Sequence, residues 1–206
     1  MISAEAAAAA RRAAEPEFLA PDSETAQDWP ALAAHLAGHG FAFDPARDAP
    51  RQFAGGFGNL NYLIRLDDAP MVLRRPPMGD IPPGANDMKR EHRILSRLWR
   101  AFPLAPRSVH YSPDVEILGN HFLIMEYRAG LCIGGTWPQF LAGRDDIGDR
   151  LGDMLVDTLV AFHAVRPEDV DLAEFGRPAG FLERAVAGWR QRMEMSCDEA
   201  PHAAGL

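Results

Sequence analysis

The chain has 206 residues, of which 47% are hydrophobic, and a formal net charge of -8 at pH 7. It is long enough to bury a sizeable core, but its acidity argues against nucleic acid as the main partner, because phosphate binding favours a basic surface. The two cysteines, Cys132 and Cys197, form no C-x-x-C pair and predict neither a disulfide framework nor a zinc cluster. No apolar run reaches the length of a membrane span, so we expect a cytoplasmic protein without a membrane partner.

The first forty residues predict an extension followed by one helix. Residues 1–24 begin with an alanine-rich helix former and continue through proline-containing breakers, so we expect a flexible extension with little function. A helix is predicted to begin near Asp28, with Pro30 in its first turn, and to stop at Gly38 or Gly40.

The segment Gln52–Leu66 has three glycines, Gly55, Gly56 and Gly58, between two strand-like runs. Glycine lets a backbone turn lie close against a ligand. A glycine loop of the dinucleotide or Walker type leads into a helix, whereas residues 61–66 alternate as a strand does. The loop is therefore predicted to form the tip of a hairpin, as in kinases that cover ATP phosphates, and a bulged hairpin without a ligand is the alternative.

The rest of the chain alternates between strand and helix signals. A third strand, Met71–Arg75, completes an antiparallel meander and is followed by a helix over 85–101. Later strands are predicted over 107–111, 115–118 and 122–126, and later helices over 137–142, 147–164 and 181–195. The order indicates a sheet of about five strands with one long helix inserted after the third.

One carboxylate falls on the apolar side of the helix predicted over 85–101. The apolar positions at helical spacing are Met88, Leu95 and Leu98. Glu91 lies on the same stripe, and a carboxylate on a buried face needs a cation. Arg74 on the preceding strand is the candidate, so we predict an Arg74–Glu91 pair. The alternative is that Glu91 lies at the edge of the stripe and reaches water.

The sequence contains a single lysine, Lys89, which lies two positions before Glu91. Helical residues two positions apart are separated by roughly 200° around the axis, so Lys89 is predicted to lie on the side opposite Glu91 and to face solvent. If a nucleotide binds, the cation that holds its phosphates must then be an arginine. Arg74 is the candidate, because it lies on the strand that follows the glycine hairpin. A guanidinium can fork across phosphate oxygens as it does across a carboxylate.

Four motifs, in order, resemble the aminoglycoside phosphotransferase family. They are Gly55–Tyr62, Val72–Pro77, Arg90–Leu95 and Phe122–Glu126. The similarity covers roughly residues 30–195 and is greatest to the branch found as kinase-like domains fused to acyl-CoA dehydrogenases and as free-standing bacterial phosphotransferases. One departure is Gly58, because the family usually places a serine before Asn59.

The resemblance implies an α+β fold with a protein-kinase-like small lobe over residues 25–127. The first helices of a mostly helical large lobe would follow over 128–206. It also implies ATP and Mg as cofactors and a small-molecule hydroxyl as the substrate.

The resemblance also implies roles for particular residues. The phosphates would be covered by Gly55, Gly56, Phe57, Gly58, Asn59 and Asn61. Arg74 would stand at the position of the kinase lysine, with Glu91 as its helix partner. Val72 would pack on the adenine, although any core strand could carry such a residue. The hinge would consist of Met125, Glu126, Tyr127 and Arg128.

The family's catalytic loop, a His-Gly-Asp followed some residues later by Asn, has no counterpart in this sequence. None of the seven histidines is followed by Gly-Asp. We therefore expect neither a catalytic residue nor a metal ligand within these residues. Two classes of function remain: the N-terminal part of an ATP-dependent phosphotransferase, inactive alone, or a non-catalytic nucleotide-binding or protein-interaction module.

Overall fold

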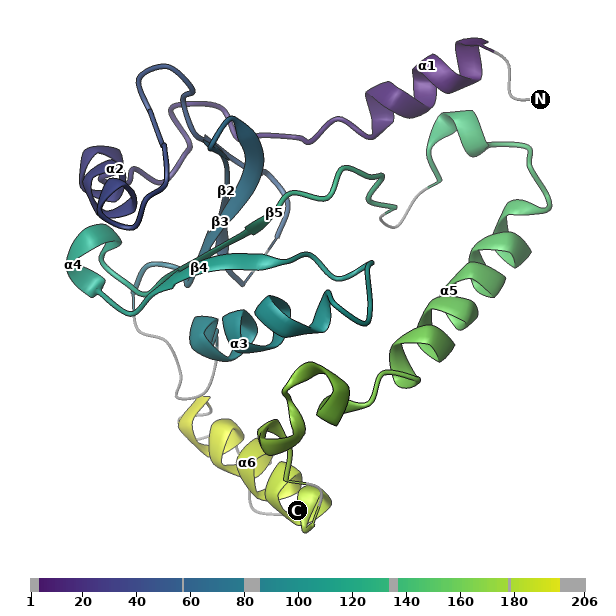
Figure 1. The fold of residues 1–206 in the computed structure, drawn as a ribbon. Coiled ribbons are helices and arrows are strands. Elements are labelled where there is room, and N and C mark those ends of the chain that lie inside the picture. Colours follow the sequence, from purple (N-terminus) through teal and green to yellow (C-terminus); the bar gives the residue numbers. More distant parts are fainter. Residues whose placement is uncertain (1–3, 57, 80–85, 134–136, 178, 197–206) are drawn as a thin grey trace.

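The computed structural model describes residues 4–56, 58–79, 86–133, 137–177 and 179–196 (Figure 1). The strands are β1 Arg51–Gln52, β2 Leu60–Leu66, β3 Ala69–Arg75, β4 Ser108–Ser112 and β5 Phe122–Glu126. The α-helices are α1 Ala4–Ala13, α2 Trp29–Gly38, α3 Met88–Leu98, α4 Val115–Leu118, α5 Ile147–His163 and α6 Phe181–Ser196. Short 3-10 helices are η1 Gln139–Leu141, η2 Pro167–Val170 and η3 Ala173–Phe175.

The five strands form one antiparallel sheet in the order β1-β2-β3-β5-β4. The turn between β2 and β3 consists of Asp67 and Asp68, both with positive φ, which matches the twist of a tight hairpin. The five-stranded sheet and the hairpin with the glycine loop at its tip are confirmed, because β1 and β2 pair on either side of that loop. The register determines which side chains share a face.

The hydrophobic core lies between one face of this sheet and the helices α2 and α4. Fully buried members from the sheet and from α2 are Leu32, Leu36, Tyr62, Leu73, Phe122 and Ile124. Helix α2 begins where predicted, because the Asp28 side chain accepts a hydrogen bond from the Ala31 N–H and Pro30 occupies the first turn.

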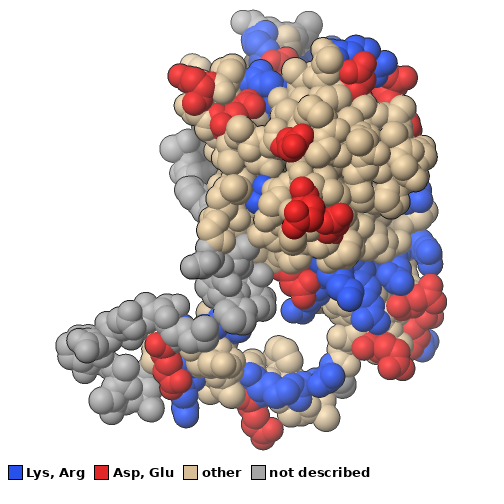
Figure 2. Space-filling view, turned by 90° about the vertical axis from the view of Figure 1, so that its left-hand side faces the viewer, with Lys and Arg blue, Asp and Glu red and all other residues tan. Residues whose placement is uncertain are grey.

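Helix α3 packs on the other face, against β4 and β5, on the side of the sheet opposite α2 (Figure 1). It begins three residues later than predicted, because Asp87 is the N-cap and accepts from the Arg90 N–H. Met88 is fully buried under the sheet. The exposed residues of α3 include Lys89 and Arg93, and Figure 2 shows a group of basic side chains near the middle height of the molecule.

Residues 115–118 were predicted to form a strand, and this prediction is wrong. They form the short helix α4, because the Asp114 carboxylate caps it by accepting from the Glu116 N–H. Gly119 ends the helix at a positive φ of 77° and donates its N–H to the Val115 carbonyl. These two local caps outweigh the strand preference of a β-branched sequence.

Part of the predicted flexible extension is attached to the sheet. The Leu19 N–H donates to the Gln52 carbonyl and the Ala54 N–H donates to the Glu17 carbonyl, both at 2.9 Å. Residues 17–19 therefore lie along the free edge of β1, where unpaired backbone groups accept an extended partner. The expectation of a loose segment up to residue 24 does not hold for these residues, whereas α1 projects away from the sheet (Figure 1).

The C-terminal part is helical and touches the sheet region at few points. Phe162 of α5 packs edge-on against Phe102 at 5.4 Å, and Arg93 lies over the ring of Phe175 at 4.9 Å. The predicted helix over 137–142 is the shorter 3-10 helix η1, whereas α5 and α6 match their predictions closely. Among the described residues, no helix has both the length and the hydropathy needed to cross a bilayer.

Candidate nucleotide site

The cross-strand register brings four of the predicted site residues onto one face of the sheet. Asn61 lies opposite Arg74, and Val72 lies opposite both Leu63 and Met125. Paired residues of neighbouring strands project to the same side. This face is opposite the α2 core and is the one on which α3 packs.

Arg74 of β3 and Glu91 of α3 form the predicted ion pair. The Arg74 Nε lies 2.9 Å from Glu91 Oε2, and 28% and 33% of the two side chains are exposed. Nε has no hydrogen-bond acceptor among the described residues, and the hydrogen bond between the two side chains is a long one, from Arg74 Nη2 to Glu91 Oε1 at 3.5 Å. The pair is neither fully buried nor free in water, and therefore lies between the two alternatives considered from the sequence.

Two asparagines complete the surroundings of the guanidinium. Asn61 Oδ1 accepts from Arg74 Nη1 at 3.4 Å. The amide of Asn59 is best oriented with its oxygen 2.7 Å from Arg74 Nη2 and its nitrogen donating to the Gly58 carbonyl at 3.1 Å. Arg74 is thus held between α3, β2 and the end of the glycine loop.

The glycine loop spans Gly55, Gly56 and Gly58, and Phe57 lies outside the described residues. Gly56 has a φ of +113°, a conformation that an L side chain rarely adopts. Around the other two glycines, nothing lies within 4 Å of where a Cβ would be. The backbone conformation therefore requires glycine at Gly56. At Gly55 and Gly58 the space that a side chain would occupy is empty.

In the predicted hinge, Glu126 is hydrogen-bonded to neighbouring residues, whereas Tyr127 and Arg128 have backbone N–H groups without an acceptor among the described residues. Glu126 donates its backbone N–H to the Arg107 carbonyl at 2.9 Å, and its Oε2 accepts from the Arg107 N–H and from Arg128 Nη2 at 3.0 and 2.8 Å. The backbone N–H groups of Tyr127 and Arg128 have no acceptor among the described residues. The edge of a planar heterocycle could use such donors.

An aromatic stack beside the hinge was not predicted. Tyr127 stacks on Phe53 with ring centroids 6.1 Å apart and an interplanar angle of 18°, and Phe53 contacts Phe18 at 5.3 Å. Phe53 lies two residues before Gly55, so its position could have indicated a role. Phe18 could not have been found, because no short-range pattern shows that residues 17–19 lie along β1.

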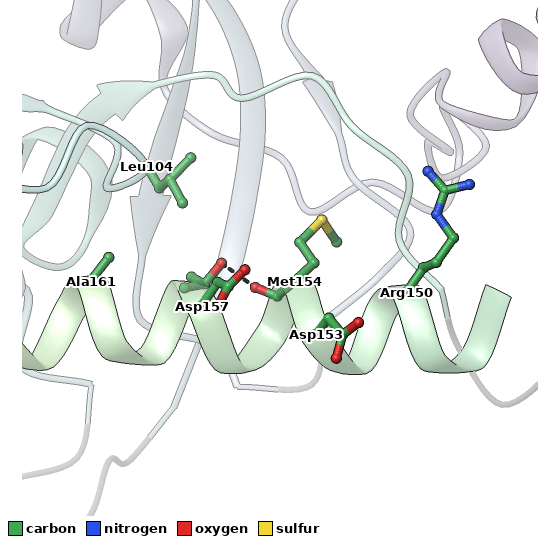
Figure 3. A pocket seen from close by; sticks show the side chains of 7 residues that line it. Leu104, Arg150, Asp153, Met154, Asp157 and Ala161 are labelled. Atoms are coloured by element: carbon green, nitrogen blue, oxygen red, sulfur yellow. Dashed lines mark hydrogen bonds between the residues drawn. The ribbon is translucent and has the colours of Figure 1, made fainter. Parts of the chain in front are cut away.

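Two cavities lie away from Arg74. One, of about 380 Å³, lies beside the hinge and includes Met71, which belongs to the α2 face of the sheet. The other, of about 490 Å³, lies between α5 and Leu104 (Figure 3). Its lining is mixed, with apolar, acidic and hydroxyl side chains and the basic Arg150. In Figure 3, Met154 projects from α5 toward the side on which Leu104 lies. This second cavity is formed by the uncovered face of α5 and contains none of the predicted nucleotide-binding residues.

Three histidines have lowered pKa values. Burial, followed by repulsion from Arg97, lowers the pKa of His92, whose Nδ1 is 2.9 Å from Ser108 Oγ. Burial is also the largest cause for His35 and for His110, whose pKa falls to about 4. His92 lies between α3 and β4, whereas the other two lie on the α2 face.

The described residues fit the phosphate and adenine parts of ATP. Besides the 2.7 Å contact to the Asn59 oxygen, the terminal nitrogens of Arg74 make long hydrogen bonds of 3.4 and 3.5 Å to Asn61 and Glu91, which stronger phosphate acceptors could replace. Residues that would hold magnesium were not identified in the sequence, and their family motif is absent from it.

The curated proteins similar to this chain include acyl-CoA dehydrogenase family members. Family member 10 of Mus musculus is 29% identical over 141 residues, which are 68% of this chain and 13% of that protein. Family member 11 of Homo sapiens is 27% identical over 181 residues, which are 84% of this chain and 22% of that protein. The chain thus spans less than a quarter of the length of these relatives.

A solved structure from Ralstonia eutropha, provisionally described as an aminoglycoside phosphotransferase, has the same fold. It aligns with a TM-score of 0.60 and 24% identity, covering 85% of this chain and 50% of that one. At this identity the likeness shows the fold alone, which is α+β and kinase-like, as the sequence motifs implied. The sequence pattern of the phosphotransferase enzyme family matches residues 50–204, more than half of the chain, and the chain therefore belongs to this family.

Proposed function

We propose that this chain is the nucleotide-binding part of an ATP-dependent phosphotransferase that acts on a small-molecule hydroxyl. The observation that carries the proposal is the placement of Arg74 at the end of the glycine loop, paired with Glu91. Bound Mg·ATP would supply the transferable phosphoryl group. Arg74 would hold phosphate oxygens, Glu91 would keep the guanidinium oriented, and the backbone around Gly56 would cover the phosphates.

The adenine end is supported by the hinge and by the apolar residues beside it. The free N–H groups of Tyr127 and Arg128 are donors for the adenine edge. Val72 and Met125 share the face of Arg74 and provide apolar contact for the ring. Phosphate and adenine positions therefore lie along the same face of one sheet.

We further propose that these residues bind nucleotide without transferring phosphate. Phosphoryl transfer in kinase-like folds needs a catalytic aspartate and metal-binding side chains, and the His-Gly-Asp motif that carries them in the family is absent from the 206 residues. The missing groups would come from further sequence or from a separate chain.

Binding of Mg·ATP to matched arginine variants tests the nucleotide site. We expect Arg74→Ala to weaken binding by about tenfold or more, because charge-assisted contacts to phosphate contribute roughly 1.5–3 kcal/mol. Arg166→Ala is the control, since Arg166 directly precedes η2 outside the sheet and 73% of its side chain is exposed. Isothermal titration calorimetry measures both, and equal affinities of the two variants would contradict the assignment of Arg74.

Release of ADP tests the absence of transfer. The chain alone, with Mg·ATP and a panel of amino sugars, amino alcohols and hydroxyacyl compounds, should release no ADP above the rate without acceptor. Substrate-dependent ADP formation would place the catalytic groups within these residues and overturn this part of the proposal. The binding experiment would stand in either case.

A non-catalytic nucleotide-binding or interaction module is the second candidate, and it is favoured by the same missing motif. The gene sequence beyond codon 206 distinguishes the two candidates. A continuing reading frame with His-Gly-Asp and Asn would support the phosphotransferase, whereas a stop codon and a matching intact mass of the native protein would support the module.

A further inference from the structure

Three histidines meet on the face of the sheet opposite the nucleotide site. His35 lies on α2, His39 is the residue that caps the end of α2, and His110 lies on β4. One ring nitrogen of each lies within 4.8 Å of the others. The ring centroids are 4.3 Å apart for His35 and His39, 5.1 Å for His35 and His110, and 4.9 Å for His39 and His110.

The fold places these rings together for local reasons. Residues four apart in a helix lie on one face, which brings His35 and His39 together at the end of α2. The register of β4 shifts between Ser108 and His110, and the buried ring of His110 lies against the His35 ring of α2. The ring centroid of Phe41 lies 5.7 Å from that of His110, and the ring centroid of Phe122 lies 5.9 Å from that of His35. These two aromatic rings give the cluster apolar neighbours.

The hydrogen bonds leave ring nitrogens suited to a metal. His39 Nδ1 lies 2.9 Å from the His35 carbonyl, and since a carbonyl only accepts, Nδ1 carries the proton and Nε2 keeps its lone pair. A histidine oriented by a carbonyl through its other nitrogen is a common arrangement for a metal ligand. His35 Nε2 and His110 Nε2 form a hydrogen bond of 2.9 Å, in which one of the two nitrogens is the donor. A metal ion would replace this bond, with the proton of the donor ring carried by its Nδ1, and both Nε2 lone pairs would then be available at one point.

We propose that His35, His39 and His110 form a binding site for a divalent transition metal ion, with Zn²⁺ as its occupant. Three imidazoles without a carboxylate favour Zn²⁺ over Mg²⁺ or Ca²⁺, which prefer oxygen ligands. Zn–N bonds of about 2.0–2.1 Å in a tetrahedral site separate ligand nitrogens by roughly 3.3 Å. The present separations run from 2.9 Å between the Nε2 atoms of His35 and His110 to no more than 4.8 Å, a range that includes this value.

The site differs in place and chemistry from the magnesium of phosphoryl transfer. It lies on the α2 face, whereas Arg74 and Glu91 lie on the α3 face. Exposed His39 gives the ion a path from solvent, and three protein ligands leave a fourth position for water. A bound ion would connect the end of α2 to β4 and so stabilise the small lobe, whether or not the chain binds ATP.

Cobalt and zinc titrations of tag-free, chelator-treated protein test this site. We expect one Co²⁺ per chain, with the visible absorption of tetrahedral coordination and displacement by Zn²⁺, and a melting temperature that rises with Zn²⁺ concentration. His39→Ala should bind Zn²⁺ at least roughly tenfold more weakly. His39 is exposed, so the variant should fold, and circular dichroism checks this.

His163→Ala is the matched control, because His163 is an exposed histidine at the end of α5. It should keep the affinity and the cobalt spectrum of the parent protein. Absence of the tetrahedral spectrum in the parent protein would overturn the proposal. It would equally be overturned if His39→Ala bound Zn²⁺ as tightly as His163→Ala did.

Discussion

Two consecutive arginines of β3 have opposite surroundings because strand residues alternate between faces. Arg74 faces α3 and pairs with Glu91 while remaining partly exposed. Arg75 is only 1% exposed and donates to neutral acceptors, Gln27 Oε1 at 2.7 Å and the carbonyls of Pro76 and Leu118. Burial lowers the pKa of the Arg75 guanidinium. We infer that Arg75 joins the end of β3 to α4 and to the segment before α2, whereas Arg74 is available to a ligand.

Alanine variants of the two arginines should therefore differ in stability. Arg75→Ala removes a buried side chain and leaves its acceptors unpaired, so the free energy of unfolding should fall by about 3 kcal/mol. Arg74→Ala removes a partly exposed ion pair, and the loss should be about 1 kcal/mol or less. Urea denaturation followed by circular dichroism measures both. Equal losses would mean that Arg75 is not structurally more important than Arg74.

At the scale of elements, local signals predicted most of the structure. The alternation over residues 61–66 and the turn residues around it identify the β2–β3 hairpin. The stripe containing Met88 and Glu91 identifies α3 and the ion pair with Arg74, but not the packing of α3 against β4 and β5. The prediction of a strand over residues 115–118 was wrong. Their β-branched composition favours a strand, but the caps at Asp114 and Gly119 stabilise a helix.

Parts of the candidate site depend on contacts between distant segments, and these could not be predicted. The stack of Tyr127 on Phe53 depends on residues 17–19 joining the edge of β1. The cluster around His110 depends on the register of β4, although the spacing of His35 and His39 was visible. Short-range periodicity predicts the individual helices and strands, whereas the segment that pairs with an edge strand is determined by tertiary structure.

The contact between α3 and β4 should make stability depend on pH through His92. Its pKa is lowered in the folded state by burial and by Arg97, and its ring stacks on Tyr111 at 5.7 Å. The unfolded chain, with a histidine pKa near 6.5, then binds more protons than the folded chain below that pH. The free energy of unfolding should therefore be retained above about pH 6.5 and fall as the pH is lowered through the folded-state pKa.

Comparison with His92→Gln isolates this contribution. Urea denaturation at pH 7.5, 6.5 and 5.5, with a chelator present, should show a steeper loss in the parent protein, by up to about 1.4 kcal/mol per pH unit for one proton. The glutamine variant loses the titrating group, so its dependence on pH should be weaker. Parallel profiles for the two proteins would show that His92 titrates alike in the folded and unfolded states.

At the scale of the whole molecule, the two long C-terminal helices have uncovered apolar faces. Helix α5 has no buried residue, and Leu155 and Leu159 are 61% and 45% exposed. Leu182 and Trp189 of α6 are also largely exposed. A monomeric protein rarely leaves so much contiguous apolar surface in water. These faces support the proposal that the rest of a large lobe, or a separate chain, covers α5 and α6.

The chain alone should therefore self-associate through α5. Burial of a leucine side chain contributes about 1.5–3 kcal/mol, so replacing Leu155 and Leu159 together by Gln should raise the dissociation constant of the self-associated form by more than about tenfold. Light scattering coupled to size exclusion measures it across a concentration series. The control changes Asp153 and Asp157 to Asn, which alters charge on the same helix without removing apolar surface. Association that responds to the aspartate changes, and not to the leucine changes, would place the contact elsewhere and remove this support for a missing half.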